Sequence, residues 1–189
     1  MTASRLTRRM VLGSLLSAGW LAHAAPSRPA VAGPAVWELP GLWEDDQGQR
    51  VTLSDWAGRP ALLTMAYGSC RKICSTSLRL LQQAQQEADA RGLELSVIVV
   101  SLDPRVDTPA SWRQFRAERG LQRPNWHFLA GAPAQIRRVA GLLEMKYWVY
   151  DDHVLHDLRI AAVDASGHIV ARVDWVDEPP RRLVDALAS

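Results

Sequence analysis

Apolar and polar segments alternate along the chain in a way that predicts strands and helices in turn. Two continuous apolar runs, residues 61–67 and 95–102, have the length and composition of strands buried on both faces. Between them, apolar residues recur at helical spacing from Leu78 onward, while glutamines occupy the outward positions. We therefore predict a helix over residues 75–90, which Gly92 ends.

The same alternation continues in both directions. Thr108 can cap a helix that has Pro109 at its first position and runs to Arg119. Further predicted elements are a strand at 126–129, a helix at 133–143, a hairpin formed by 158–164 and 168–175, and a closing helix at 178–188. Near the start, residues 36–39 and 50–53 flank a polar turn at 45–48, which predicts an N-terminal hairpin. This order predicts an α/β fold, a central mixed β-sheet flanked by helices.

Residues 1–24 have the features of a signal peptide. Basic residues at the start precede an apolar run over residues 11–22, and residues 22–24 resemble an A-x-A cleavage site. The run is too short to span about 30 Å of hydrocarbon as a helix. Arg8 and Arg9 resemble the pair of a twin-arginine export signal, with a Sec signal or an uncleaved anchor as alternatives. We predict a flexible linker over residues 25–35, rich in Pro and Ala, and one domain over residues 36–189.

The charge of the mature domain argues against a nucleic-acid partner. The signal holds three of the 22 basic residues and none of the acidic ones, which leaves 19 basic against 20 acidic residues. Export predicts a periplasmic location, free or tethered to the inner membrane, with membrane contact only through an uncleaved signal. In such an oxidising compartment a lone cysteine pair can cycle between redox states or bind a metal.

Cys70 and Cys74 are the only two cysteines of the chain, and they open the helix predicted after the first buried strand. Their spacing places both side chains on one face of the first turn. A helix N-terminus favours the thiolate, and Arg71 and Lys72 between the two act in the same direction. Such a pair is a redox couple or a set of two soft metal ligands. A structural disulfide is the alternative, but a bridge that closes so short a loop stabilises little.

Three features together resemble the Sco/SenC family. They are residues 67–74 with the cysteine pair, the run Ser-Leu-Asp-Pro-Arg-Val-Asp-Thr-Pro at 101–109, and His156 further on. The resemblance implies an exported, thioredoxin-like protein that binds copper and serves cytochrome c oxidase assembly. It also implies that Cys70, Cys74 and His156 are the ligands of Cu(I) or Cu(II), a donor set that suits soft Cu(I).

Asp103 and Asp107 would lie beside this site, at the same edge of the sheet as the cysteines. The alternative is that the Asp107 segment serves only to start the following helix.

The choice of histidine is between two neighbours. His156 stands two residues before the strand predicted from 158, at a point that the resemblance places opposite the cysteine loop. His153 belongs to residues 150–153, which we interpret as a solvated loop, and is the alternative ligand. Arg71 and Lys72 depart from the family pattern, which usually has Pro and an acidic residue after the first cysteine. Two positive charges at this place disfavour an incoming cation and give weight to redox chemistry.

The resulting prediction is a metallochaperone rather than an enzyme. It would deliver copper to a cuproenzyme such as cytochrome c oxidase, or keep the cysteines of that enzyme reduced. Candidate partners are the copper-bearing oxidase subunit or another cuproprotein, together with another copper chaperone or a thiol reductant.

The alternative is a periplasmic thiol–disulfide oxidoreductase, with Cys70 and Cys74 as its catalytic redox pair. Two features count against it. Three residues separate the cysteines, and no proline between 133 and 179 could supply the cis-proline that such enzymes place against the pair.

Overall fold

The computed structural model describes residues 34–68, 73–151 and 153–188. The predicted signal peptide lies outside the described residues, and so does most of the predicted linker. None of the described helices is both long enough and apolar enough to cross a membrane.

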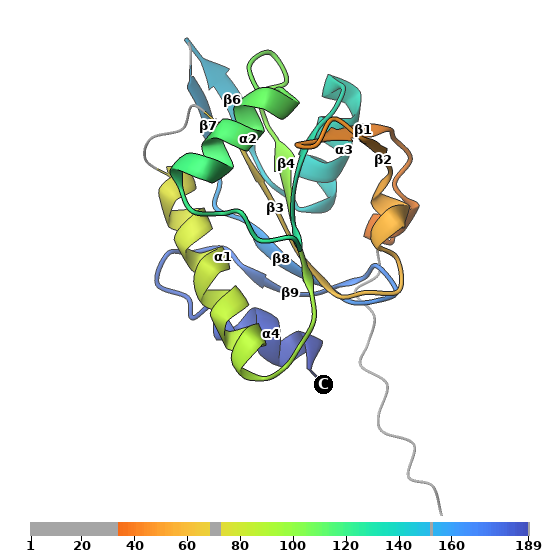
Figure 1. Ribbon diagram of the computed structural model, residues 1–189, viewed down its shortest axis with the longest axis vertical. Helices are drawn as coiled ribbons and strands as arrows, with labels where there is room; N and C mark the ends of the chain where they lie inside the picture. The colour runs from red at the N-terminus through yellow and green to blue at the C-terminus, as the bar shows by residue number, and fades with distance from the viewer. Residues whose placement is uncertain (1–33, 69–72, 152, 189) are drawn as a thin grey trace, which may run out of the picture.

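The described strands form a seven-stranded mixed sheet and a separate two-stranded one (Figure 1). The large sheet has the order β2-β1-β5-β4-β3-β8-β9. Its centre is parallel, β3 with β4 and β4 with β5, whereas β8, β9 and β1 join antiparallel. The bounds are β1 Trp43–Asp45, β2 Arg50–Val51, β3 Ala61–Ala66, β4 Ser96–Ser101, β5 Trp126–Ala130, β8 Ile160–Val163 and β9 Ile169–Val173.

Within the described residues, four α-helices flank this sheet, as the alternating pattern predicts. They are α1 Ile73–Ala90, α2 Pro109–Glu118, α3 Pro133–Leu142 and α4 Arg181–Leu187. α1 lies beside α4, which in turn contacts β8 and β9 (Figure 1). α2 packs on β5 through the rings of Trp112 and Phe128, whose centroids are 5.1 Å apart. β3 and β4 are buried along their whole length, so the continuous apolar runs are central strands, as predicted.

The N-terminal hairpin exists, but the prediction of its first strand is wrong. β1 and β2 form it, whereas residues 36–38 are a short 3-10 helix, η1 Val36–Glu38. A contact distant in sequence decides this: Val36 N–H donates to the carbonyl of Gly167 at 2.8 Å, and the Trp37 indole donates to that of Ala165. The polar turn is as predicted, and a second 3-10 helix, η2 Leu53–Trp56, precedes β3.

The interpretation of residues 150–153 as a solvated loop is right in exposure but wrong in structure, because Tyr150 and His153 are exposed strand residues. Tyr150 ends β6 Tyr147–Tyr150 and His153 begins β7 His153–His156, and the two strands form an antiparallel hairpin that projects beyond one end of the main sheet (Figure 1). Asp151 in its turn has φ 53°, a left-handed conformation that Asp tolerates better than most residues. His156 therefore ends a strand instead of preceding one. The closing helix likewise begins at Arg181, three residues later than predicted.

Candidate functional site

His156 is a buried side chain at the end of β7, with only 7% of its surface exposed. Its Nδ1 lies 2.8 Å from the backbone oxygen of Asp157, and since a carbonyl can only accept, Nδ1 carries the proton. Nε2 is then the ring nitrogen whose lone pair can coordinate a metal. The buried Tyr67, at the end of β3, meets the imidazole edge to face, with ring centroids 6.1 Å apart. These contacts set the orientation of the imidazole ring.

Asp157, whose carbonyl orients His156, is itself held in place across the base of the hairpin. Its N–H donates to the oxygen of Lys146, and its carboxylate accepts from the Lys146 N–H, both at 3.0 Å. Arg159 lies beside it and forms an ion pair with Asp174 at 3.0 Å. Asp174 directly follows β9, so the ion pair of Arg159 holds the segment that orients the imidazole against the main sheet.

Of the two predicted thiolate ligands, Cys74 is the second residue of α1, and Cys70 lies outside the described residues. Thr76, two residues beyond Cys74, lines one pocket of about 480 Å³ together with His156. The structure thus brings His156 to the first turn of the helix that carries Cys74. Within the described part of the chain, no group of three or more His, Cys, Asp or Glu could hold a metal ion, and Cys70 is not among those residues.

His153, the alternative ligand, lies in another environment. It is exposed and pairs with Tyr150 across the hairpin next to the turn, three positions from His156. Because successive residues of a strand point to opposite faces, His153 and His156 lie on opposite faces of β7. The geometry favours His156 over His153 as the residue beside α1.

Asp107 holds the backbone at the entrance to the cysteine segment. Its carboxylate accepts from Gly68 N–H at 2.9 Å and from the Ser101 hydroxyl at 2.6 Å, and it is buried. A Cβ on Gly68 would lie 3.0 Å from this carboxylate, so the close approach favours glycine there. Helix capping belongs to Thr108, whose side chain accepts from Ser111 N–H. Asp107 therefore positions the chain before the cysteines and is more than a helix start.

Asp103 has a different role in the same loop. Its carboxylate forms a two-pronged ion pair with Arg105, at 2.7 and 2.8 Å. The hydrogen bonds from Arg105 hold the pKa of Asp103 below its usual value. For Asp107 the opposite holds, because burial raises the pKa of that carboxyl to about 6. The two aspartates predicted beside the site thus differ in charge state in mildly acidic solution.

The stability of the fold should fall as the pH rises from about 4 to 6. In that window the unfolded chain has released the Asp107 proton while the folded chain still holds it, which costs about 2 to 3 kcal/mol by pH 7. Asp107→Asn removes this titration. Denaturant unfolding across the pH range should show the variant gaining stability relative to wild type by that amount. Asp103→Asn is the control and should leave the slope in place. An equal slope in Asp107→Asn and wild type would contradict the assignment.

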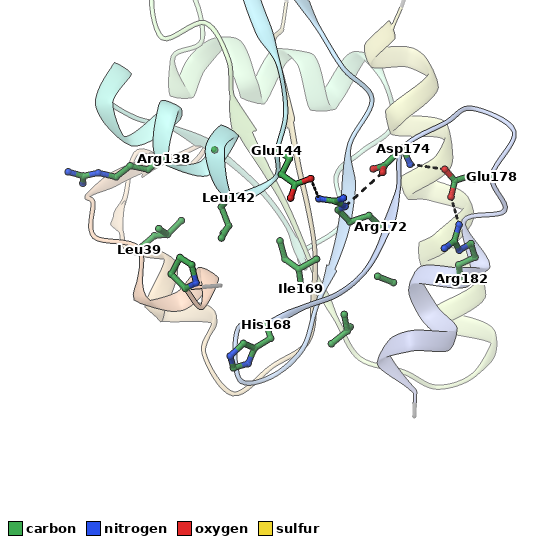
Figure 2. A pocket seen from close by; sticks show the side chains of 14 residues that line it. Leu39, Arg138, Leu142, Glu144, His168, Ile169, Arg172, Asp174, Glu178 and Arg182 are labelled. Atoms are coloured by element: carbon green, nitrogen blue, oxygen red, sulfur yellow. Dashed lines mark hydrogen bonds and ion pairs between the residues drawn. The ribbon is translucent and has the colours of Figure 1, made fainter. Parts of the chain in front are cut away.

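A larger cavity, about 800 Å³, lies elsewhere, along β9 and the end of α3 (Figure 2). Its charged side chains pair with one another: Arg172 with Glu144 at 2.9 Å, and Arg182 with Glu178. None of the predicted site residues lines it. It is therefore a separate feature of the fold, connected to the His156 region only through Asp174, which lines both pockets.

Residues 42–189 match the model of the SCO1/SenC family. A SCO1 protein homolog from Bacillus subtilis is 26% identical over 153 residues, which cover 78% of this chain and 79% of the relative.

Two solved structures are similar to the model. ScoI of Bradyrhizobium japonicum with copper bound has 25% identity and a TM-score of 0.64, and the match covers 78% of this chain and 98% of that one. BsSco, a member of the Sco family of cytochrome c oxidase assembly proteins in which a disulfide switch was identified, has 21% identity and a TM-score of 0.71, with 84% and 93% covered. The thioredoxin-like α/β fold predicted from the sequence is confirmed.

Proposed function

The chain belongs to the SCO1/SenC family, and from this premise we propose that it is an exported copper-binding protein. It delivers copper to a cuproenzyme such as cytochrome c oxidase, or keeps the cysteines of that enzyme reduced. The protein acts in the periplasm, to which the signal peptide in residues 1–24 directs it. The partner is the copper-bearing oxidase subunit or another cuproprotein.

The observation that supports this proposal most is the place of His156. A buried imidazole with its Nδ1 proton committed to a carbonyl presents Nε2 as a ligand, which is how metal-binding histidines are oriented in proteins. The first turn of α1, which carries Cys74, lines the same pocket. Two thiolates and one imidazole are a soft donor set that suits Cu(I). In this proposal Cys70, Cys74 and His156 hold copper as cargo.

Thiol–disulfide exchange is the second candidate function, with Cys70 and Cys74 as the reacting pair. The position of Cys74 in the first turn of a long helix supports it, since the helix N-terminus stabilises the thiolate. Arg71 and Lys72 act in the same direction. Against it, the described residues contain no cis peptide bond, the feature that thioredoxin-type oxidoreductases place against their redox pair.

A comparison of two histidine variants tests the ligand assignment. His156→Ala should weaken Cu(II) binding by more than about 100-fold, beyond the loss typical of an outer-shell partner, and Cu(I) binding by less than about tenfold. The smaller loss follows because the two thiolates alone satisfy soft Cu(I). His153→Ala, the matched control on the other face of β7, should bind both ions as wild type does. Competition titrations with both oxidation states measure this, and the reverse pattern would transfer the assignment to His153.

A further inference from the structure

Most of the large apolar side chains that are exposed in the described residues lie around the candidate site. Eight such side chains are exposed in the described part of the chain, and seven of them belong to three segments that border the candidate site. We call these seven the apolar rim: Val106, Trp148, Val149, Tyr150, Leu155, Trp175 and Val176. The eighth, Leu42, lies next to β1, where it lines a different pocket. Exposed apolar groups gathered in this way mark an interaction site.

Each of the three segments touches the surroundings of the site. Val106 lines a pocket together with Gly68, the last described residue before the segment that carries Cys70. Trp175 and Val176, in the loop between β9 and α4, line the pocket that contains His156. The hairpin of β6 and β7 carries His156 itself, with the exposed Leu155 directly before it. The apolar rim therefore surrounds the candidate site from three directions.

The hairpin presents two of its aromatic side chains, Trp148 and Tyr150, outward. Trp148 pairs with Leu155 across the two strands, and these side chains are 54% and 38% exposed. The next pair on the inner side, Tyr147 with His156, faces the body of the protein. A two-stranded hairpin with one apolar face on the body and a second one exposed is unusual for a soluble domain, because the exposed face gains nothing from burial in the free protein.

We propose that the apolar rim is the surface on which a partner protein docks over the candidate copper site. The proposal rests on the proposed function, because passing copper directly requires the two sites to come within bonding distance. Copper stays Cu(I) throughout the transfer to the partner. Its bonds to Cys70, Cys74 and His156 break as bonds to thiolates of the partner form, and the protons that the partner's thiols release go to the thiolates left behind.

The charges on the rim segments indicate what kind of partner fits. Asp151 in the hairpin turn and Asp177 in the β9–α4 loop are exposed carboxylates. The cations on the described rim segments are Lys146 and Arg105, and Arg105 is already paired with Asp103. The cysteine segment that the rim borders adds the two basic residues at 71 and 72, so the surface carries charges of both signs. Such a pattern fits a protein partner of complementary pattern better than a uniformly anionic lipid surface. The partner is therefore a protein with an apolar patch, basic side chains opposite the rim carboxylates and acidic ones opposite the cysteine segment.

The size of the rim predicts a transient complex. The two tryptophans and the tyrosine are 54 to 71% exposed, so they leave roughly 400 Å² for a partner to cover, and the four aliphatic rim side chains are smaller. That is below the roughly 800 Å² per partner of a stable interface. A brief encounter suits a protein that hands on its cargo and leaves. Trp148 and Trp175 are the expected anchors, because tryptophan is among the commonest energetic centres of interfaces.

The test measures docking with both proteins metal-free and reduced. The probe is the soluble copper-bearing domain of the cytochrome c oxidase subunit from the same organism, titrated into labelled protein and followed by NMR. Wild type should bind it, and the double variant Trp148→Ser/Trp175→Ser should bind at least about tenfold more weakly. The matched control Leu42→Ser, which removes an equally exposed apolar side chain away from the site, should bind as wild type does.

Equal binding by all three proteins, or no binding by wild type, would overturn the docking surface. The proposal would also be overturned if wild type bound anionic phospholipid vesicles, or self-associated in sedimentation, and the double variant lost this property. The first result would favour a membrane, and the second would favour a second copy. The proposed function is judged separately, by Cu(I) titration of the protein alone. The single variant Trp148→Ser should bind Cu(I) as wild type does, since Trp148 does not line the pocket of His156, and a loss of Cu(I) binding there would show that the rim belongs to the metal site itself.

Discussion

Cys70→Ala and Cys74→Ala are each expected to abolish copper binding. Each substitution removes one of two thiolates, and a single thiolate with an imidazole leaves Cu(I) without the soft pair that retains it. After anaerobic loading and desalting, wild type should hold about one copper ion per chain and either variant close to none. Copper retained at the wild-type level by either variant would contradict the ligand assignment.

The stability of the same variants distinguishes a copper site from a structural disulfide. Only three residues lie between the cysteines, and the loop they would close is too short for its closure to stabilise the fold much. Oxidised wild type and Cys70→Ala should therefore unfold at similar denaturant concentrations. A loss of several kcal/mol, within the roughly 2 to 5 kcal/mol typical of native bridges, would instead favour a structural role.

Asp46→Ala is expected to cost about 3 to 5 kcal/mol of unfolding free energy, the largest loss that we predict for a residue away from the site. Asp46 is buried just after β1 and forms an ion pair with the buried Arg116 of α2. Arg116 also donates to the carbonyls of Leu121 and Arg123, so its guanidinium stays in place when its counter-ion is removed. The substitution therefore leaves a buried charge unpaired.

Urea unfolding measures this loss, and a second aspartate supplies the matched control. Asp185 pairs with Arg91 at 2.6 Å, but these side chains are 55% and 36% exposed. An exposed pair contributes at most about 1 kcal/mol, so Asp185→Ala should lie near wild type. Similar losses for the two variants would show that Asp46 does not act through a buried ion pair.

Local patterns predict most of the main sheet and its helices. Continuous apolar runs identify β3 and β4, because a strand buried on both faces has no polar side to show. The Thr108–Pro109 start of α2 is predictable for a similar reason, since a cap and its proline act within a few residues. The helix that carries Cys74 is also evident from apolar spacing, which predicts it over 75–90 and so places its start two residues late.

Features that depend on distant contacts are not predictable in this way. Val36 reads as part of a strand, but its partner is the carbonyl of Gly167, far along the chain. The role of Asp107 requires knowing that Gly68 lies beside it. The β6–β7 hairpin, by contrast, leaves a local signal that the sequence reading missed: aromatic and β-branched residues on both sides of an Asp-Asp turn.

Some features of the candidate site are likewise predictable from sequence, whereas others depend on tertiary contacts. The cysteine pair and its position at a helix start follow from sequence, and so does the choice of His156 through the family resemblance. The burial of His156, its bond to the Asp157 carbonyl and its shared pocket with α1 are tertiary facts. The apolar rim likewise depends on which large side chains the fold leaves exposed, and no local pattern distinguishes those from core residues.

An anaerobic Cu(I) titration against a competing chelator tests the central claim most directly. Wild-type protein should take up about one Cu(I) per chain and hold it more tightly than a simple dithiol does, because the imidazole of His156 joins the two thiolates. Binding no tighter than that of a simple dithiol would contradict the copper-binding account and favour the thiol–disulfide oxidoreductase.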